Sequence, residues 1–409
     1  MPGLTTAAAY GALGWAGFLA WLAVGAVWRR WQLQRRFASA RAAPATEHDA
    51  HLTELRVLIM RPCAGVDHDL LANLLSVAEV DSRTQWRVVM TVDDPADLAR
   101  PVILEAIPKL RAMGVDAHTF IPPQTGPNRK ASMLAAIMAS EQGREAEVLI
   151  NVDSNVDLRG YDLDGLIAPL LGPRRGDGRV GASWAPWSER RTQAGVGPRA
   201  SEAVLGGSLA AFPLLCGIDP GGLVGKLWAV RREALDAVGD FDELTDYLGE
   251  DFEMARRLRA AGWSIAVAPV LARARGGDPP FRAVVGRFAR WMLVVRGQRP
   301  LLLATYPLLF FATPLILALA AVGALAQPTL AGLAVALAVF ARALITISAR
   351  RWSGRGEGLA GALAWIRDAF LSDLVLALAW VRALSSRTID WRGHLLRVDR
   401  EGRLHALKK

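Results

Sequence analysis

The uncharged stretch 7–28 constrains this chain most. An apolar run of about 20 residues, coiled into a helix, spans the hydrocarbon core of a bilayer, which is about 30 Å thick. Trp15 and Trp21 lie within the stretch, and tryptophan favours membrane–water interfaces. Arg29 and Arg30 follow at once, whereas a cleavable signal peptide carries its positive charge before a shorter apolar run. We therefore expect an uncleaved membrane anchor, N-terminus outside and following residues in the cytoplasm, rather than a buried core helix.

The C-terminal part of the chain is apolar again. Residues 301–326 and 329–348 predict two further membrane helices. The segment 359–384 is also apolar, but it carries Asp368 and Asp373, whose charges are costly in lipid. This segment could lie along the membrane interface, pack inside a helix bundle or cross the bilayer.

Charge and cysteine content exclude several classes of protein. The chain has 48 Lys and Arg against 39 Asp and Glu, so its formal net charge is +9. The positive side chains cluster beside apolar segments and the sequence has no basic–aromatic RNA-binding motif. We therefore expect anionic lipid or phosphorylated small molecules as partners, and no nucleic acid. Cys63 and Cys216 allow neither a disulfide framework nor a CxxC metal motif, which fits a reducing compartment.

Between the apolar regions, short apolar strands alternate with helical stretches. The predicted strands are 55–60, 86–92, 115–121, 147–152, 225–231 and 264–268. The predicted helices are 69–80, 96–113, 129–142 and 249–261. This alternation predicts an α/β domain whose mostly parallel sheet is covered on both faces. Such sheets bind ligands at the carboxyl ends of their strands.

These patterns divide the chain into segments of different character. The predicted segments are a membrane anchor with a basic juxtamembrane stretch (1–37), a linker (38–53), the α/β domain (54–280), an amphipathic interfacial helix (281–298), membrane helices (299–385) and a basic cytoplasmic tail (386–409). The tail has a strand–turn–strand pattern. The α/β domain is long enough to bury one large core.

Polar side chains follow two of the predicted strands. Asp93 and Asp94 come directly after WRVVMTV, where a carboxylate can accept hydrogen bonds from a base N–H or a ribose hydroxyl. Asp153 and Asn155 follow LINV, and their oxygens suit Mg²⁺ or Mn²⁺ bridging a diphosphate. The alternative is a turn and a helix N-cap at Asp93 and Asp94, and a plain turn at Asp153 and Asn155.

Two of the predicted helices begin with polar or charged side chains. Asn128, Arg129 and Lys130 stand at the start of the third helix, where free backbone N–H groups and positive side chains can bind a diphosphate. The alternative there is a solvated helix start. Asp251 lies in the first turn of the last helix, where it could act as a general base towards an acceptor hydroxyl. The alternative is the acidity that is common in first turns.

The amphipathic stretch 281–296 contains the motif RFARW, with Arg287, Arg290 and Trp291. The two arginines are three positions apart and share a helix face, and Trp291 beside them can stack on a ligand or anchor at an interface. A basic interfacial helix that touches anionic lipid is the alternative, and both interpretations can hold together.

The order of these motifs resembles the inverting family 2 type glycosyltransferases with a GT-A fold. It is most similar to the ceramide glucosyltransferase branch and to bacterial hopanoid-associated enzymes. The segments that carry the resemblance are RPCAGVDHDLLANLLSV, TVDDPAD, GPNRKASML, INVDSNVDL, GKLWAVRREALDAVGDF, GEDFEMARRLRAAGW, RFARW and DWRGHLLRV. The resemblance covers nearly the whole chain, and its most specific parts are GEDFEMA and RFARW at their separation.

The resemblance implies a function and roles for single residues. A hexose would move from a UDP-sugar to a ceramide- or sphingolipid-like acceptor with inversion, with Mg²⁺ or Mn²⁺ as cofactor. The enzyme would be an integral protein of the bacterial inner membrane with a cytoplasmic catalytic domain. The implied roles are nucleotide-sugar binding for Asp93, Asp94, Asn128, Lys130 and Asp153, metal binding for Asp153 and Asn155, general base for Asp251, and diphosphate or acceptor binding for Arg287, Arg290 and Trp291.

Three features depart from the family pattern. Asn155 replaces an acidic residue of the metal motif, and no histidine lies between His118 and His394, where the eukaryotic ceramide enzymes carry one. The stretch 188–224, which bears on the acceptor in this branch, matches poorly. The alternatives are therefore transfer to another lipid such as a hopanoid, transfer to a growing polysaccharide, and a catalytically inactive membrane scaffold.

Overall fold

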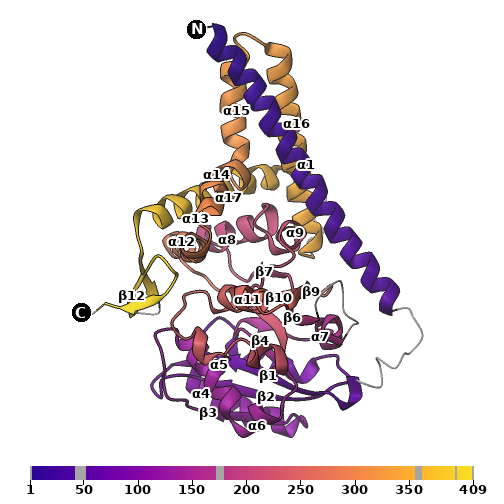
Figure 1. Cartoon of the computed structure of the whole chain (residues 1–409), viewed down its shortest axis with the longest axis vertical. Helices are drawn as coiled ribbons and strands as arrows, with labels where there is room; N and C mark the ends of the chain where they lie inside the picture. Colours follow the sequence, from indigo (N-terminus) through magenta and orange to yellow (C-terminus); the bar gives the residue numbers. More distant parts are fainter. Residues whose placement is uncertain (1, 42–51, 172–178, 355–361, 392–393, 408–409) are drawn as a thin grey trace. The chain divides into compact units, whose positions relative to one another are not determined.

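The computed structural model describes residues 2–41, 52–171, 179–354, 362–391 and 394–407. The chain divides into two compact units (Figure 1). The α/β unit consists of Arg36–Arg190, Pro220–Gly277 and Thr388–Lys409. The helical unit consists of Met1–Arg35, Arg191–Asp219 and Asp278–Arg387. The segment 191–219, which the sequence places within the α/β domain, thus groups with the apolar helices.

A seven-stranded sheet forms the core of the α/β unit, in the order β3-β2-β1-β4-β8-β6-β9. Its strands are β1 Arg56–Pro62, β2 Gln85–Thr91, β3 Ala117–Phe120, β4 Val148–Val152, β6 Val180–Trp184, β8 Leu227–Arg231 and β9 Ser264–Val267. Every described pairing is parallel except the two that β8 makes with β4 and β6. The strand β4 reads VLINV and is buried throughout, because both faces of the sheet are covered. The predicted mostly parallel α/β sheet is confirmed.

Helices pack along this sheet. They are α3 Leu70–Leu75, the 3₁₀ helix η1 Ser76–Glu79, α4 Ala99–Ala112, α5 Arg129–Ala139, α6 Glu141–Glu145, α7 Leu163–Leu171, α10 Arg232–Asp236, the 3₁₀ helix η2 Asp242–Leu244 and α11 Glu250–Ala260. The prediction of one helix over 129–142 is wrong at its end. Ser140 takes an extended conformation and its hydroxyl accepts a hydrogen bond from the Gly143 N–H, so it caps the separate helix α6.

Two small sheets complete the α/β unit. One has the order β5-β10-β7 and consists of β5 Val156–Asp157, β7 Trp187–Arg191 and β10 Ala272–Gly276. The other is antiparallel and consists of β11 Thr388–Trp391, β12 His394–Val398 and β13 Leu404–Ala406. The strand–turn–strand pattern predicted for the tail is therefore present, with a third strand added.

The helical unit contains the apolar segments. Its helices are α1 Pro2–Arg41, α8 Val196–Gly207, α9 Phe212–Ile218, α12 Phe281–Gln298, α13 Pro300–Ala304, α14 Tyr306–Leu309, α15 Ala312–Gly323, α16 Pro328–Trp352 and α17 Ala362–Ser385. α1 runs through the first residues of the predicted linker 38–53, most of which lies outside the described residues. The prediction of one helix over 301–326 is wrong. Pro300 is the first residue of α13 and Pro307 the second residue of α14, because proline lacks the N–H that would continue a preceding helix.

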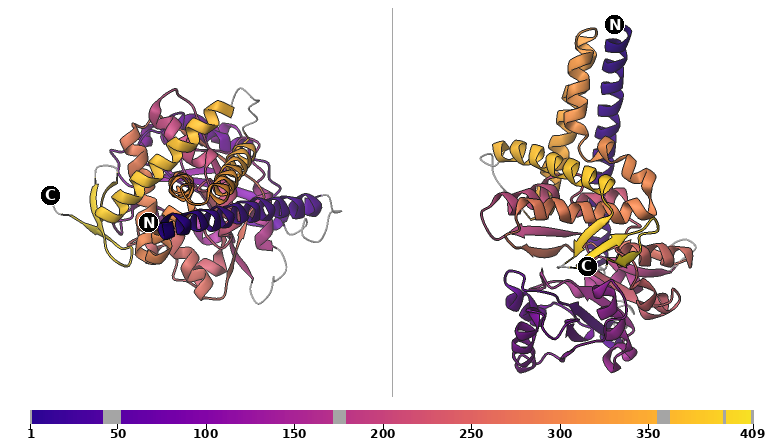
Figure 2. Two further views of the ribbon diagram at one scale, coloured as in Figure 1. Left: turned by 90° about the horizontal axis from the view of Figure 1, so that it is seen from above. Right: turned by 90° about the vertical axis from the view of Figure 1, so that its left-hand side faces the viewer.

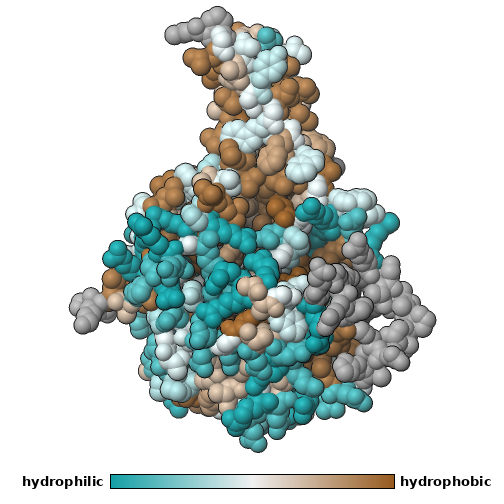
Figure 3. Space-filling model, viewed as in Figure 1, coloured by the Kyte–Doolittle hydropathy of each residue, from teal (hydrophilic) through white to brown (hydrophobic). Residues whose placement is uncertain are grey.

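Three helical stretches are long and apolar enough to cross a membrane: Gly3–Arg35, Val196–Ile218 and Pro328–Trp352. α1, α15 and α16 lie side by side (Figures 1 and 2). A side chain at Gly323 would come within 2.6 Å of the Ala9 Cα, so α1 and α15 approach closely because that position is a glycine. On the face that Figure 3 shows, hydrophobic residues lie along these helices on both sides of a paler stripe. The structure thus supports the predicted association with a membrane.

α17 contains most of the segment 359–384, of which residues 359–361 lie outside the described residues. It packs on α8 and α12 (Figure 2). Asp368 pairs with Arg199 at 2.9 Å and with Arg350 at 3.5 Å, and Asp373 pairs with Arg342 at 2.8 Å. One face of the segment therefore packs on the helical unit, where arginines of α8 and α16 compensate its acidic side chains. Apolar side chains of its other face, such as Ile366 and Phe370, are exposed.

Candidate active site

The antiparallel direction of β8 brings two loops together at one edge of the sheet. Val152, the last residue of β4, pairs with Leu227, the first residue of β8. The Asp153 N–H then donates to the Lys226 carbonyl at 2.9 Å. Because β2 and β4 both run parallel to β1, Asp93 after β2 and Asp153 after β4 lie at the same edge of the sheet. This edge is where α/β sheets bind ligands.

Lys130, in the first turn of α5, connects several residues at this edge. Its ammonium lies 2.9 Å from Asp153 Oδ1 and 3.0 Å from Glu250 Oε1, and it donates to the Gly225 carbonyl at 3.0 Å. Burial by itself would lower the pKa of Lys130, but the carboxylates of Asp153, Glu250 and Asp251 raise it above its usual value. Lys130 is therefore a fixed positive charge within an acidic cluster.

Asp251 lies in the first turn of α11 and is part-buried. Burial and the negative charge of Glu250 raise the pKa of Asp251 to about 7, while Lys130 opposes the rise. Its Oδ1 accepts a hydrogen bond from the Phe252 N–H at 2.8 Å. A side chain at Gly225 would come within 2.7 Å of Asp251 Oδ2, so this oxygen faces the loop before β8. A carboxyl with such a pKa can exchange a proton near neutral pH.

Asn128 joins the starts of α5 and α11 and is fully buried. Its Oδ1 caps α5 by accepting from the Ala131 N–H at 3.0 Å. Its Nδ2 donates to the Tyr247 carbonyl at 2.7 Å and to Glu250 Oε2 at 3.3 Å. Both polar ends of the amide thus contact the protein, and they fix Lys130 and Asp251 relative to each other.

The acidic pair after β2 divides into two environments. Asp93 is buried and pairs with the Arg129 guanidinium, whose other end contacts His394 Nε2 at 2.9 Å. Asp93 Oδ1 is buried and has no hydrogen-bond partner among the described residues. Asp94 is exposed, and its Oδ1 accepts from the Ala96 N–H at 2.8 Å, which closes the turn. Asp93 therefore carries an acceptor oxygen that a donor group of a ligand could use.

The predicted metal ligands face lysine ammonium groups. Asn155 Oδ1 accepts from Lys226 Nζ at 2.7 Å, and the same ammonium lies 3.8 Å from Asp153 Oδ2. Lys130 binds the other Asp153 oxygen. No group of three or more His, Cys, Asp and Glu side chains suited to a metal ion occurs among the described residues. This donor set does not fit Mg²⁺ or Mn²⁺, because cationic groups occupy the oxygens that either ion would need.

Three residues at this edge were not predicted as site residues. Lys226 fell inside the predicted strand 225–231, and its place beside Asp153 depends on the antiparallel direction of β8. Glu250 stood next to Asp251 in the motif, which was a usable signal. His394 lies 265 residues from Arg129, and no local pattern predicts that contact.

The RFARW residues belong to the helical unit. The Arg287 guanidinium donates to Ser201 Oγ and lies 5.7 Å from the Trp291 ring centroid. Trp291 packs edge-on against Phe212, at a centroid separation of 5.8 Å. Arg290, on the same helix, is half-buried. The assignment of Arg287, Arg290 and Trp291 to diphosphate or acceptor binding stays a prediction.

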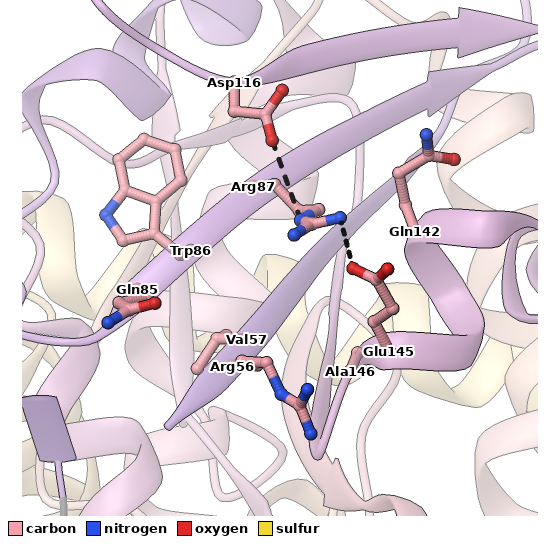
Figure 4. Close-up of a pocket in the computed structure, with 9 residues that line it drawn as sticks. All are labelled: Arg56, Val57, Gln85, Trp86, Arg87, Asp116, Gln142, Glu145 and Ala146. Atoms are coloured by element: carbon pink, nitrogen blue, oxygen red, sulfur yellow. Dashed lines mark hydrogen bonds and ion pairs between the residues drawn. The ribbon is translucent and has the colours of Figure 1, made fainter. Parts of the chain in front are cut away.

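A cavity of about 250 Å³ lies at the opposite edge of the sheet (Figure 4). Arg56 and Gln85, the first residues of β1 and β2, line it. Arg87 there pairs with Glu145 at 3.0 Å and with Asp116 at 3.6 Å. The cavity is at the amino ends of the strands and contains none of the predicted site residues.

A family model and several solved structures are similar to this chain. A family model described as Glycosyl transferase family 21 matches residues 17–404. A solved mannosyltransferase from Pyrobaculum calidifontis, in complex with GDP-Man and Mn²⁺, is 16% identical, and the match covers 91% of this chain and 99% of that one with a TM-score of 0.45. Glucosyl-3-phosphoglycerate synthase from Mycobacterium tuberculosis, in complex with Mg²⁺ and UDP, is 16% identical over 62% of this chain and 83% of its own, with a TM-score of 0.35.

Proposed function

The chain belongs to glycosyl transferase family 21, and we propose that it transfers a hexose from a UDP-sugar to a lipid acceptor, with inversion at the anomeric carbon. The α/β unit is then the GT-A catalytic domain. The observation that carries the proposal is the Asp251 carboxyl, which has a pKa of about 7 beside the Lys130 ammonium at the ligand-binding edge of the sheet. The family membership shows a glycosyltransferase, and the acceptor, the inversion and the base are our inference.

The reaction is a single displacement with Asp251 as general base. The acceptor hydroxyl oxygen forms a bond to the anomeric carbon while Asp251 takes the hydroxyl proton. The bond between the anomeric carbon and the diphosphate oxygen breaks, and UDP leaves with the electron pair. No covalent enzyme intermediate is needed, so one displacement inverts the configuration.

The charged residues at the sheet edge receive the donor. Lys130 is placed to stabilise the negative charge that develops on the departing diphosphate. The buried Asp93 Oδ1 can accept a hydrogen bond from the uracil N–H, and Asp94 beside it faces the uridine. Asn128 holds the two helix starts, whereas Arg287, Arg290 and Trp291 bind the diphosphate or the acceptor.

A divalent cation is the part of the family expectation that this geometry supports least. Mg²⁺ or Mn²⁺ would have to bind Asp153 and Asn155, whose oxygens face Lys130 and Lys226. We therefore include no metal in the steps above.

The apolar helices support a lipid acceptor. Three helical stretches are long and apolar enough to cross a membrane. In α1, Trp21 and Trp28 are each more than half exposed, and tryptophan favours membrane–water interfaces. An enzyme anchored in this way can work on a poorly soluble acceptor that stays in the bilayer. We place the catalytic domain on the cytoplasmic side, where nucleotide-sugars are made available, with a ceramide- or sphingolipid-like molecule as acceptor.

Asp251→Asn tests the proposal. The substitution keeps the shape of the side chain but removes its ability to take a proton, so we expect transfer of hexose into extractable lipid to fall by at least about 100-fold. UDP binding, measured by calorimetry, should remain. Asp236→Asn is the matched control, because Asp236 is on the exposed end of α10.

Three outcomes would contradict the proposal. If Asp251→Asn transfers hexose at nearly the wild-type rate, Asp251 is not the general base. If the labelled product is a polymer instead of a lipid, the protein is a polysaccharide synthase. A wild-type protein that binds no UDP would be an inactive scaffold. Mass spectrometry of lipids from cells with and without the protein identifies the acceptor by its added hexose mass.

A further inference from the structure

We propose that the C-terminal sheet β11–β13 is a working part of the donor site, in which it positions the helix starts that carry Asp251 and Lys130. The inference rests on the proposed function, since it assumes that these helix starts bind a UDP-sugar. The sequence presents this segment as a basic tail with a strand–turn–strand pattern and assigns none of its residues to the site. Its contacts within the α/β unit give it a defined role.

The tail forms backbone hydrogen bonds with the loop that precedes α11. The Leu404 N–H donates to the Asp246 carbonyl at 2.7 Å, and the Leu248 N–H donates to the Gly402 carbonyl at 3.0 Å. Tyr247 and Arg403 pair as an antiparallel bridge. The loop 246–248 therefore behaves as an added edge strand of the tail sheet, and it ends three residues before Asp251.

Asn128 holds the same loop from its other side. The Thr245 carbonyl accepts from the Asn128 N–H at 2.8 Å, and the Tyr247 carbonyl accepts from Asn128 Nδ2 at 2.7 Å. The loop is thus fixed between the tail sheet and the start of α5. Movement of the tail would shift Asp251 relative to Lys130, and a displacement of about 1 Å at a catalytic group can cost about 100-fold in rate.

His394 gives the tail a second contact with the site. Its Nε2 lies 2.9 Å from Arg129 Nη1, and Arg129 also pairs with the buried Asp93. Arginine can only donate, so Nε2 is the acceptor in this contact. His394 therefore orients the Arg129 guanidinium. Through Arg129 it orients the Asp93 carboxylate, which we propose binds the uracil. It is a positioning residue and is not assigned a contact with the substrate.

A series at His394 tests the second contact. We expect His394→Ala to raise the Kd of UDP by about fivefold to tenfold, because loss of a hydrogen bond to a charged group weakens the orientation of Arg129. His394→Gln should bring the Kd back to within about twofold of wild type, since its amide oxygen can also accept. His405→Ala is the matched control, because His405 is in the same tail but contacts Asp399 within it, at 2.9 Å.

A proline pair tests the backbone contact. Leu404→Pro removes the N–H that reaches Asp246, whereas Leu407→Pro removes an N–H that bonds Leu395 inside the tail. We expect Leu404→Pro to lower kcat by at least about tenfold with the Kd of UDP within about threefold, and Leu407→Pro to lower it much less. Far-UV circular dichroism and the melting temperature establish that each variant is folded.

The outcomes separate this inference from the proposed function. If wild type binds UDP and transfers hexose but His394→Ala matches His405→Ala in Kd, the role of His394 is overturned. If Leu404→Pro is folded and turns over like Leu407→Pro, the role of the backbone contact is overturned. If Leu404→Pro does not fold, the UDP affinities of the His394 variants decide whether the tail positions the donor site. A wild type that binds no UDP removes the proposed function itself.

Discussion

At the scale of single residues, Asp251 lies between charges of opposite sign. Burial and Glu250 raise the pKa of its carboxyl to about 7, and Lys130 opposes them. A base must be ionised to take a proton, and a carboxyl with this pKa is protonated in acid. We therefore expect kcat/KM for lipid glycosylation to rise with pH through about 7 and to level off above it. Initial rates measured across the neutral range at acceptor concentrations well below KM check this.

Glu250→Gln is the matched variant for that profile. It removes a negative charge beside Asp251 and keeps an oxygen that can accept from Asn128. The pKa of Asp251 should fall, so the midpoint of the profile should move to lower pH. Glu243→Gln, whose side chain is 61% exposed, should leave the midpoint in place. A midpoint that is the same in both variants would contradict the electrostatic origin of the shift.

The residues that sequence reasoning found share a local signal. Asp153 follows a buried strand, while Lys130 and Asp251 stand in the first turns of helices, so a motif and a predicted element suffice to propose them. Lys226 and His394 carry no such signal. Their places depend on the direction of β8 and on a tail that returns to the sheet edge, and neither property is local.

At the scale of secondary structure, α17 shows how buried charge is tolerated in an apolar helix. Asp368 pairs with Arg199 and Arg350, and the side chains of Asp368 and Arg350 are each 6% exposed. Removing one member of a buried ion pair leaves its partner uncompensated and costs about 3–5 kcal/mol. We expect Asp368→Ala to lower the melting temperature in detergent by about 6–20 °C, at about 2–4 °C per kcal/mol.

Arg367→Ala provides the comparison for that measurement. Its side chain is 59% exposed and lies 3.8 Å from the same carboxylate. A pair exposed on one side contributes about 0–1 kcal/mol, so this variant should melt within about 4 °C of wild type. Equal melting temperatures for the two variants would mean that the Asp368 contacts do not stabilise the helical unit.

Apolar patterns predicted where strands and helices occur better than they predicted where helices end. All six predicted strands are present, because runs such as VLINV are short, β-branched and buried on both faces. The region 301–326 reads as one apolar helix, but it is divided among α13, α14 and α15, with Pro307 in the first turn of α14. Another missed helix end is at Ser140. Its side chain caps α6, and its extended backbone ends α5. The strands β5, β6, β7 and β10 were not predicted, since they are short or contain polar and glycine residues.

At the scale of the whole molecule, two helices end in arginine clusters. α1 carries Arg29, Arg30, Arg35 and Arg36 towards its C-terminal end, and α16 carries Arg350 and Arg351 in its last turn. Short basic stretches next to membrane helices stay in the cytoplasm. Both C-terminal ends should therefore be cytoplasmic, and the residues between α15 and α16 should be on the other side.

Reporter fusions test this topology. Green fluorescent protein fused after Lys409 should fluoresce and alkaline phosphatase at the same place should be inactive, because the first needs the cytoplasm and the second an oxidising compartment. Insertion after Ala326, in the turn between α15 and α16, should give the opposite pair of results. Active phosphatase after Lys409 would place the C-terminal tail, and with it the proposed donor site, on the side of the membrane that lacks nucleotide-sugars. The matched pair of positions controls for expression, since each reporter is expected to work at one of them.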